Sequence, residues 1–513
     1  MFKKQPKGLI AASLANMGER FGFYTMMAIL TLFLMSKFGL DKTSAGIIYS
    51  VFYFSIYILA LVGGVIADKT RNYKGTILGG LICMAIGYLL IAIPTPTPAP
   101  EGQKGMYLAM TCFGLFVIAF GNGLFKGNLQ ALVGQMYDNP QYNKMRDSGF
   151  SLFYMFINVG AIFAPFIAPA VREWWLGQFD FAYNSDLPEL CHGFINKTLT
   201  PDAMTRFNEL AASVCMNETT PGDLLTFANS YLNVFTTGFH YAFAVAIIAM
   251  LISLVIFLVS KKNLPGSNGK AAKGDDKKEM NKEEIVMSAQ EIKQRIWALI
   301  AVFGIVIFFW FSFHQNGLTL TFFAKDYTLL KIGSMNITAE QFQSMNPFFV
   351  VFLTPVVLAV FGWLRARGKE PAAPAKIAIG MGIAALAYLV MVVGSLNLPG
   401  SQEVQNMGGL PNAMRVTPFL LIVVYFILTV AELFISPLGL SFVSKVAPPK
   451  YQGLMQGGWL GATALGNQLL FIGAILYEHV PLWLTWTVFV VACCISMITM
   501  IFMLGWLNRI TKS

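Results

Sequence analysis

Long apolar runs separated by short polar segments repeat along the whole chain. Twelve of these runs are close to or longer than the roughly 20 residues that an α-helix needs to cross a hydrocarbon core of about 30 Å. The runs are continuous rather than alternating at every second residue, which excludes a transmembrane β-barrel. The pattern therefore predicts an all-α membrane protein whose transmembrane helices lie at residues 9–36, 45–67, 75–94, 106–134, 149–171, 239–260, 296–323, 343–364, 377–396, 416–444, 452–477 and 481–507.

The twelve spans form two halves of six, divided by a polar segment rich in Lys, Gly and acidic residues. Such a composition predicts a flexible tether, whose later part, from Lys282, could form a short surface helix. The predicted parts are spans 1–5 of the N-terminal half (1–171), an external loop (172–238), span 6 (239–260), a cytoplasmic linker (261–295) and spans 7–12 of the C-terminal half (296–513).

Charge sets the orientation of the chain in the membrane. Only 12% of the residues are charged and 56% are hydrophobic, against about 25% charged in an ordinary soluble domain. The formal charge of +10 comes mostly from Lys and Arg in segments that are cytoplasmic when both termini are cytoplasmic. This positive-inside bias explains the basic character of the chain, so the lipid bilayer is the expected partner and no nucleic acid is required.

The external loop, 172–238, is too long for a simple connector and should contain local structure. Within it, "TPGD" predicts the start of a helix, with Thr220 as cap, Pro221 at the first position and Asp223 completing a capping box.

Two cysteines, Cys191 and Cys215, lie in the same external loop. They could form a disulfide in an oxidising compartment or remain as two thiols. His192 is the only other candidate metal ligand nearby, so we expect no zinc site and no cofactor. The chain also lacks the His-Glu-x-x-His, Gly-x-Ser-x-Gly and phosphate-loop motifs of common enzymes, so we expect no enzymatic activity.

A few ionisable groups interrupt the predicted spans: Glu19, Arg20, Lys126, Glu432 and His314. Charges at bilayer depth are costly and are tolerated mainly where they face a bundle interior or a water-filled cavity. Each single charge could belong to a structural ion pair. Together, two positive and two negative groups could converge on one cavity that binds a small zwitterionic solute.

The helical spacing of three and four residues supports this convergence. Four spans each carry one polar stripe, and the stripes are Asn16, Glu19, Arg20, Phe23 and Met27 in span 1; Asn122, Lys126 and Gln130 in span 4; Trp310, His314, Gly317 and Leu318 in span 7; and Tyr425, Thr429, Glu432 and Ser436 in span 10.

Several motifs in these spans resemble those of one transporter family. They are "NMGERFGFY" (16–24), "GNGLFKGN" (121–128), "RDSGFSLFYMFINVGA" (146–161), "NPFF" (346–349) and the segment from "AELF" to "QGGW" (431–459). On these motifs the chain resembles the proton-dependent oligopeptide transporter (peptide transporter) family. The six-plus-six layout is that of the major facilitator superfamily, in which the substrate site lies near the bilayer midplane between the halves.

The resemblance implies a role for each matching residue. By position, Arg20 and Lys126 would hold the peptide carboxylate; Asn158, Asn346 and Glu432 would hold the ammonium end; and Tyr24, Trp310 and Trp459 would wall the pocket. Lys126 paired with Glu432 would close the cytoplasmic side. The resemblance therefore implies import of di- and tripeptides by alternating access, driven by protons, in the cell inner membrane. The superfamily layout works as a monomer.

Five positions depart from the family pattern. Gly127 stands where proline is usual, and Phe23 stands where the span 1 motif usually has its first tyrosine. The other three departures replace charged residues. Asn16 replaces the first glutamate of the span 1 motif, Met27 replaces an arginine, and His314 replaces a glutamate in span 7. The arginine and glutamate absent at positions 27 and 314 form the external gate pair of the family. Loss of one partner of a buried pair typically costs about 3–5 kcal/mol, whereas replacement of both can be neutral. Because both partners are replaced, no unpaired buried charge is left, and the double replacement is compatible with a stable fold.

These replacements leave several candidates for the residue that binds the coupled proton. Glu19, Glu432 or His314 could carry the proton, His314 could be a satisfied structural residue, or transport could be uncoupled. A histidine in this position also resembles the plant nitrate-transporting branch of the family, so a second interpretation is an anion or other small solute bound by Arg20, Lys126 and His314. A solute sensor that binds without transport is a third.

Overall fold

The computed structural model is almost entirely helical and describes residues 5–138, 141–142, 145–217, 222–265, 288–448 and 451–512. Within these residues, twelve helical segments are long and apolar enough to cross a membrane. They are Lys7–Phe38 (α1), Lys42–Thr70 (α2), Tyr73–Ala92 (α3), Lys104–Met136 (α4), Gly149–Gly177 (within α5, Arg146–Gly177), Leu224–Asn263 (α8, Leu224–Ser260, with η3), Ala289–Tyr327 (α9, Ala289–Phe313, with η4 and α10), Ala339–Ala366 (η5 with α11, Met345–Ala366), Ala373–Ser395 (α12), Pro418–Ser436 (within α14, Pro418–Val446), Leu454–His479 (α15, Gln452–Gln468, with α16) and Leu482–Ile510 (within α17, Leu482–Lys512).

Shorter elements complete the described chain. They are helices α6 (Leu187–Ile195), α7 (Pro201–Val214), α10 (Thr319–Tyr327), α13 (Ser401–Asn406) and α16 (Leu470–His479), the 3-10 helices η3 (Lys261–Asn263), η4 (His314–Gly317), η5 (Ala339–Ser344) and η6 (Asn412–Met414), and strands β1 (Lys331–Ile332) and β2 (Met335–Asn336). The two strands pair antiparallel, Lys331 with Asn336 and Ile332 with Met335.

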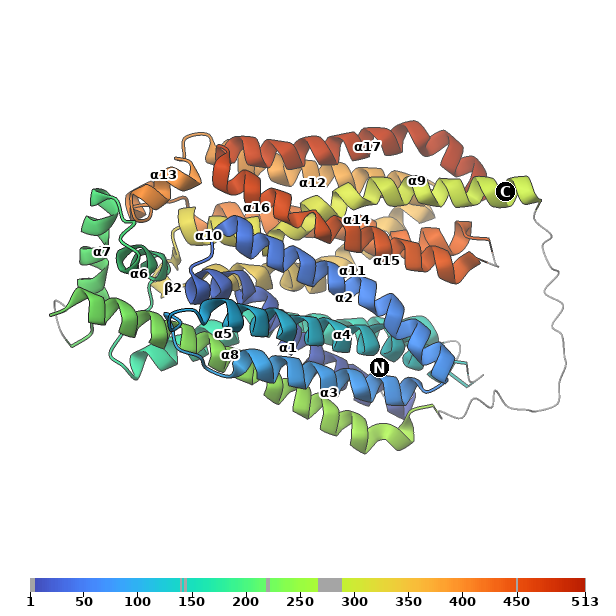
Figure 1. Ribbon diagram of the computed structural model, residues 1–513. Coiled ribbons are helices and arrows are strands. Elements are labelled where there is room, and N and C mark those ends of the chain that lie inside the picture. The colour runs from blue at the N-terminus through green and yellow to red at the C-terminus, as the bar shows by residue number, and fades with distance from the viewer. Residues whose placement is uncertain are drawn as a thin grey trace.

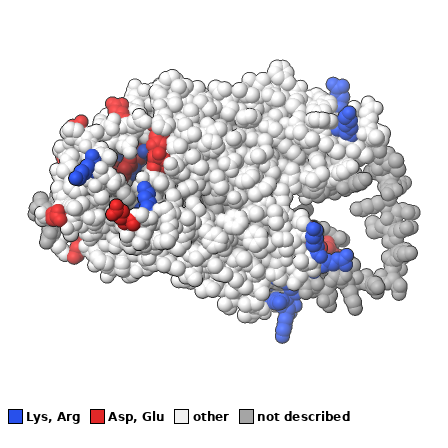
Figure 2. Space-filling model, viewed as in Figure 1, with Lys and Arg blue, Asp and Glu red and all other residues white. Residues whose placement is uncertain are grey.

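The spans assemble as two side-by-side halves (Figure 1). The first six lie together in the lower part of the view and the last six in the upper part, and both termini lie at the same end. The opposite end carries α6, α7 and α13. Figure 2 shows a belt with almost no charged side chain between two charged ends, and Lys and Arg dominate the end that carries the termini. This distribution agrees with an orientation in which that end is cytoplasmic.

Span 6 begins earlier than the apolar pattern predicts. The predicted helix start at Thr220 and Pro221 falls outside the described residues, and the described helix begins at Leu224. Asp223 is itself the cap, because its carboxylate accepts hydrogen bonds from the backbone N–H groups of the second and third helical residues at 3.1 and 3.3 Å. The described helix therefore has Asp223 as its direct N-cap, whereas the sequence pattern places Asp223 inside the first turn.

Span 7 contains a break that the sequence does not predict. The expected continuous helix 296–323 is divided by η4 (His314–Gly317) into α9 and α10. The carbonyl oxygen of Asn316, within this turn, accepts a hydrogen bond from the hydroxyl of Tyr425 at 2.6 Å. The side chain thus satisfies a backbone group that the turn leaves outside the regular helical pattern.

Helices α6 and α7 form an external cap between α5 and α8, and the two cysteines of this region are not joined by a disulfide. Cys191 is buried in α6, and burial raises the pKa of its thiol. The Cys215 thiol instead donates a hydrogen bond to the carbonyl oxygen of Ala211 at 3.3 Å, and the Cys215 backbone bridges to Phe181. The local pairing of Cys215 thus replaces the disulfide that the loop position allows.

Helices α2 and α4 approach each other closely at two glycines. A methyl group at Gly63 would overlap the backbone of Gly123, and one at Gly123 would overlap the backbone of Leu59. The contact fixes how α4 presents its polar stripe, because backbone cannot move aside as a flexible side chain can. Small residues at such crossings are typical of helix packing in membranes.

We expect Gly63→Val to destabilise the protein by about 1–3 kcal/mol, the usual cost of overpacking a filled interior. Gly64→Val is the matched control, because a Cβ at Gly64 meets no atom within 4 Å while the change in helix propensity is the same. Thermal unfolding in detergent measures both. Equal melting temperatures for the two variants would show that the α2–α4 contact is not rigid.

Candidate functional site

A cavity of about 260 Å³ lies between the two halves, and the polar stripes of all four predicted helices reach it. It also receives side chains from α2, α5, η5 and α11. The predicted site residues that line it are Arg20, Tyr24, Lys126, Asn158, Trp310, His314, Asn346 and Glu432. Eight residues selected from one sequence thus surround a single space.

Glu19 and Arg20 explain the charged pair in the middle of span 1. The Arg20 guanidinium donates to both carboxylate oxygens of Glu19, Nε to Oε2 at 2.5 Å and Nη2 to Oε1 at 2.7 Å. Asn122 of α4 donates a further hydrogen bond to Glu19 Oε1 at 2.7 Å. Arg20 lines the cavity, whereas Glu19 is fully buried behind it. Glu19 therefore holds Arg20 in place and does not face the cavity.

Lys126 is the second cation of the cavity. Its ammonium lies 4.7 Å from the centre of the Tyr57 ring, and Gln130 lines the cavity one turn further along α4. A cation at this distance from an aromatic face is attracted by the ring electrons. Among the described ion pairs, none contains Lys126, so the Arg20 side chain has a carboxylate partner and Lys126 does not.

Glu432 faces the cavity from α14 and is held by one amide. Asn346 Nδ2 donates to Glu432 Oε2 at 2.8 Å and to the hydroxyl of Thr429 at 3.1 Å. The predicted pair between Lys126 and Glu432 is not formed in this conformation, in which the described ion pairs that join the halves lie at the external end. Lys126 and Glu432 line the cavity from opposite halves, and in this conformation the contacts that draw the halves together lie at the other end of the molecule.

His314 lies at the break in span 7, between two rings. Its imidazole stacks on Trp310 at 4.9 Å and lies 4.8 Å from Tyr53 of α2. Its Nδ1 is hydrogen-bonded to Oδ1 of Asn467 in α15, which can only accept, so Nδ1 carries the proton. In the neutral ring Nε2 is then unprotonated, and His314 brings a hydrogen-bond acceptor to the cavity wall.

Asn158 and Tyr24 complete the predicted set on the N-terminal half. Asn158 Nδ2 donates to the Tyr154 carbonyl oxygen at 3.0 Å. The Tyr24 ring packs edge-on against Phe23 at 5.4 Å. Trp459, by contrast, does not line this cavity: it is buried beside Phe303, with a ring-centre distance of 6.5 Å.

Tyrosines of α2 are the site residues that the sequence reasoning misses. Tyr49, Tyr53 and Tyr57 all line the cavity, and successive rings lie 5.8 and 5.9 Å apart. Their spacing of four residues within an apolar run is a readable signal, because it places three phenols on one helix face. In this row of three tyrosines, Tyr57 lies against Lys126 and Tyr53 lies against His314.

The arrangement suits a ligand that carries both charges. The cations Arg20 and Lys126 come from the N-terminal half, and the carboxylate of Glu432 comes from the C-terminal half. A zwitterion that spans the cavity can therefore make charge-assisted hydrogen bonds to both halves at once.

Comparisons with known proteins agree with this architecture. The sequence model of the POT family matches residues 74–273 and 267–482. Dipeptide and tripeptide permease B of Xenorhabdus bovienii is 27% identical, over 99% of this chain and 97% of its own length. Dipeptide and tripeptide permease A of Chromobacterium violaceum is 28% identical, over 90% and 84%.

Solved structures of similar fold cover the whole chain. The crystal structure of a mutant peptide transporter POT in complex with alafosfalin matches with a TM-score of 0.74 at 23% identity, covering 100% of this chain and 97% of that one. A POT family transporter in complex with 5-aminolevulinic acid matches with a TM-score of 0.71 at 21% identity, covering 100% and 98%. The predicted all-α, twelve-span major facilitator fold is thus confirmed.

Proposed function

This chain belongs to the POT family of membrane transporters, and we propose that it imports di- and tripeptides by alternating access, with protons as the coupling ion. The observation that carries the proposal is the cavity between the halves, with Arg20 and Lys126 on one wall and Glu432 on the other. The names of the bacterial relatives, dipeptide and tripeptide permeases, support the substrate class.

Lys126 is the residue that we expect to contribute most to binding the peptide carboxylate. Arg20 already donates two hydrogen bonds to Glu19, so it brings less unpaired charge to the cavity. Glu432 and Asn346, already bonded to each other, would receive the peptide ammonium, with Asn158 beside them. Tyr24 and Trp310 would form the apolar walls.

Two of the three candidate proton carriers have access to the cavity. Glu432 and His314 line it, whereas Glu19 is enclosed by Arg20 and Asn122. We therefore favour Glu432 or His314 as the group that binds the transported proton and assign Glu19 the role of positioning Arg20.

The multi-pass architecture and the bacterial relatives support a place in the cell inner membrane. The excess of Lys and Arg at the end that carries both termini supports a cytoplasmic location for that end (Figure 2).

We expect Lys126→Ala and Glu432→Ala each to reduce dialanine uptake at least tenfold, because each removes a charge-assisted hydrogen bond worth about 1.5–3 kcal/mol. Uptake into proteoliposomes measures the effect. Gln130→Ala is the control, because it shortens a side chain of the same cavity and helix without removing a charge. Full activity in either charged-residue variant, with the protein correctly folded, would exclude this binding site.

We expect His314→Ala to flatten the pH dependence of uptake between about pH 6 and 8 if His314 carries the proton, because the reference pKa of histidine is about 6.5. With a histidine carrier, uptake falls as the external pH rises through that value and the carrier deprotonates. Uptake rates across this pH range measure it. A lower rate with an unchanged pH profile would assign His314 a structural role and leave Glu432 as the carrier.

A further inference from the structure

Ion pairs join the two halves at the external end of the molecule. Among the described residues four pairs cross between them, and these are Lys42–Asp326 at 3.3 Å, Lys325–Glu189 at 3.5 Å, Arg415–Asp186 at 2.7 Å and Arg172–Glu340 at 2.5 Å. All must separate before the cavity can open to the outside, because each has one partner on either half.

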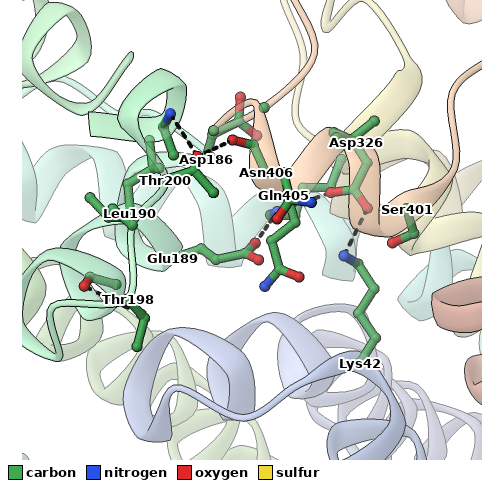
Figure 3. A pocket seen from close by; sticks show the side chains of 17 residues that line it. Lys42, Asp186, Glu189, Leu190, Thr198, Thr200, Asp326, Ser401, Gln405 and Asn406 are labelled. Carbon is green, nitrogen blue, oxygen red and sulfur yellow. Dashed lines mark hydrogen bonds and ion pairs between the residues drawn. The ribbon is translucent and has the colours of Figure 1, made fainter. Parts of the chain in front are cut away.

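Two of these pairs lie around a cavity of about 270 Å³ beneath the external cap (Figure 3). Figure 3 shows Lys42 reaching from α2 toward Asp326, with Glu189 on the opposite wall. The Glu189 side chain is 34% exposed. The Lys325–Glu189 pair, with this access to water, is worth about 0–1 kcal/mol and can open at little cost. The Lys42–Asp326 and Arg415–Asp186 pairs are more enclosed, because their side chains are less than 10% exposed.

The Arg172–Glu340 pair is the most enclosed of the four. Both side chains have 0% exposure. Only Arg172 Nη1 and Glu340 Oε1 meet, while Arg172 Nε and Nη2 and Glu340 Oε2 lie buried without a hydrogen-bond partner. Each charge therefore depends on the other for compensation. A buried pair of this kind is strongly destabilised when one partner is removed.

Arg172 is fixed to the N-terminal half by aromatic packing. Its guanidinium carbon lies 4.1 Å from the ring centre of Tyr183, 5.0 Å from that of Phe239 and 5.3 Å from that of Phe235. Its stem packs against Gly238, where any Cβ would collide. The N-terminal half thus forms a rigid cationic socket, and the carboxylate that enters it comes from the other half.

Glu340 connects this socket to the central cavity. It lies in η5, the 3-10 helix that leads directly into α11. Gln343, three residues on, lines the cavity and donates to the Ala28 carbonyl oxygen of α1 at 3.4 Å. Asn346, three residues further, holds Glu432. A single short segment therefore carries both the external ion pair and a proposed ligand of the substrate.

We propose that Arg172 and Glu340 are the ionic latch of the external gate, the ion pair that must separate before the external side opens. The proposal rests on the alternating-access transport proposed above. In the closed state the carboxylate of Glu340 compensates the caged guanidinium, and in the outward-open state both charges reach water. Loss of the Glu340 charge then destabilises only the closed state.

The test measures the conformation of the protein rather than its transport rate. Spin labels are attached to cysteines introduced at two exposed positions, Glu101 and Met335. Glu101 lies in an external loop of the N-terminal half and Met335 in the hairpin of the C-terminal half, so the distance between the labels reports the separation of the external ends. Pulsed electron–electron distance measurements are made on the full chain with its native cysteines replaced by alanine.

We expect Glu340→Gln to raise the ratio of outward-open to closed molecules at least tenfold, about 1.4 kcal/mol. Glu189→Gln is the matched control, because it makes the same substitution in a solvated pair that also crosses between the halves, and it should change the ratio less than threefold. An unchanged ratio in Glu340→Gln, or equal shifts in the two variants, would overturn the latch.

The double variant Arg172→Gln/Glu340→Gln keeps the test valid if the single variant does not fold. It removes the ion pair without leaving an uncompensated buried charge, so its ratio should exceed that of the wild type by less than the tenfold expected for Glu340→Gln. A ratio equal to that of the wild type would overturn the proposal. The test separates failure of the latch from failure of the proposed function. A protein that takes up no peptide but shows these shifts contradicts only the transport proposal. Normal uptake with unshifted distances contradicts only the latch.

Discussion

A charge between apolar helices must be paired or must face a polar cavity, and this constraint organises the whole molecule. Separation of a buried charge from its partner costs several kcal/mol, a large part of the total stability of a domain. Glu19 satisfies the constraint by pairing with Arg20, and Arg172 satisfies it through Glu340. Lys126, which has an aromatic face beside it, and Glu432, which is held by an amide, satisfy it by facing the cavity.

The constraint also divides the work between the two halves. The N-terminal half brings the cations of the cavity, and the C-terminal half brings Glu432. At the external end the carboxylate Glu340 again comes from the C-terminal half and enters a cationic socket of the other half. In the proposed mechanism, charges of opposite sign on opposing halves let one ligand draw the halves together, and η5 connects that event to the proposed gate. Such a linkage is what alternating access requires.

Much of the fold and most of the site could be predicted from the sequence. Apolar run length locates the spans, and the three- and four-residue spacing of polar groups brings Arg20, Lys126 and Glu432 to one cavity, because helical periodicity determines which residues share a face. Trp459 does not reach the cavity, since position in a motif does not set side-chain direction. The pairing of Lys126 with Glu432 depends on conformation, which no single sequence pattern encodes.

Tertiary contacts account for the remaining differences. The break at His314 depends on a hydroxyl from α14 and an amide from α15, and both are distant in sequence. The Arg172–Glu340 pair likewise joins residues far apart in the chain, one of them in a loop-proximal segment that hydropathy does not single out.

The most direct measurement is uptake of labelled dialanine into proteoliposomes with and without an inward proton gradient. Accumulation above equilibrium only with the gradient is the predicted result, and the absence of uptake under both conditions would contradict a peptide transporter.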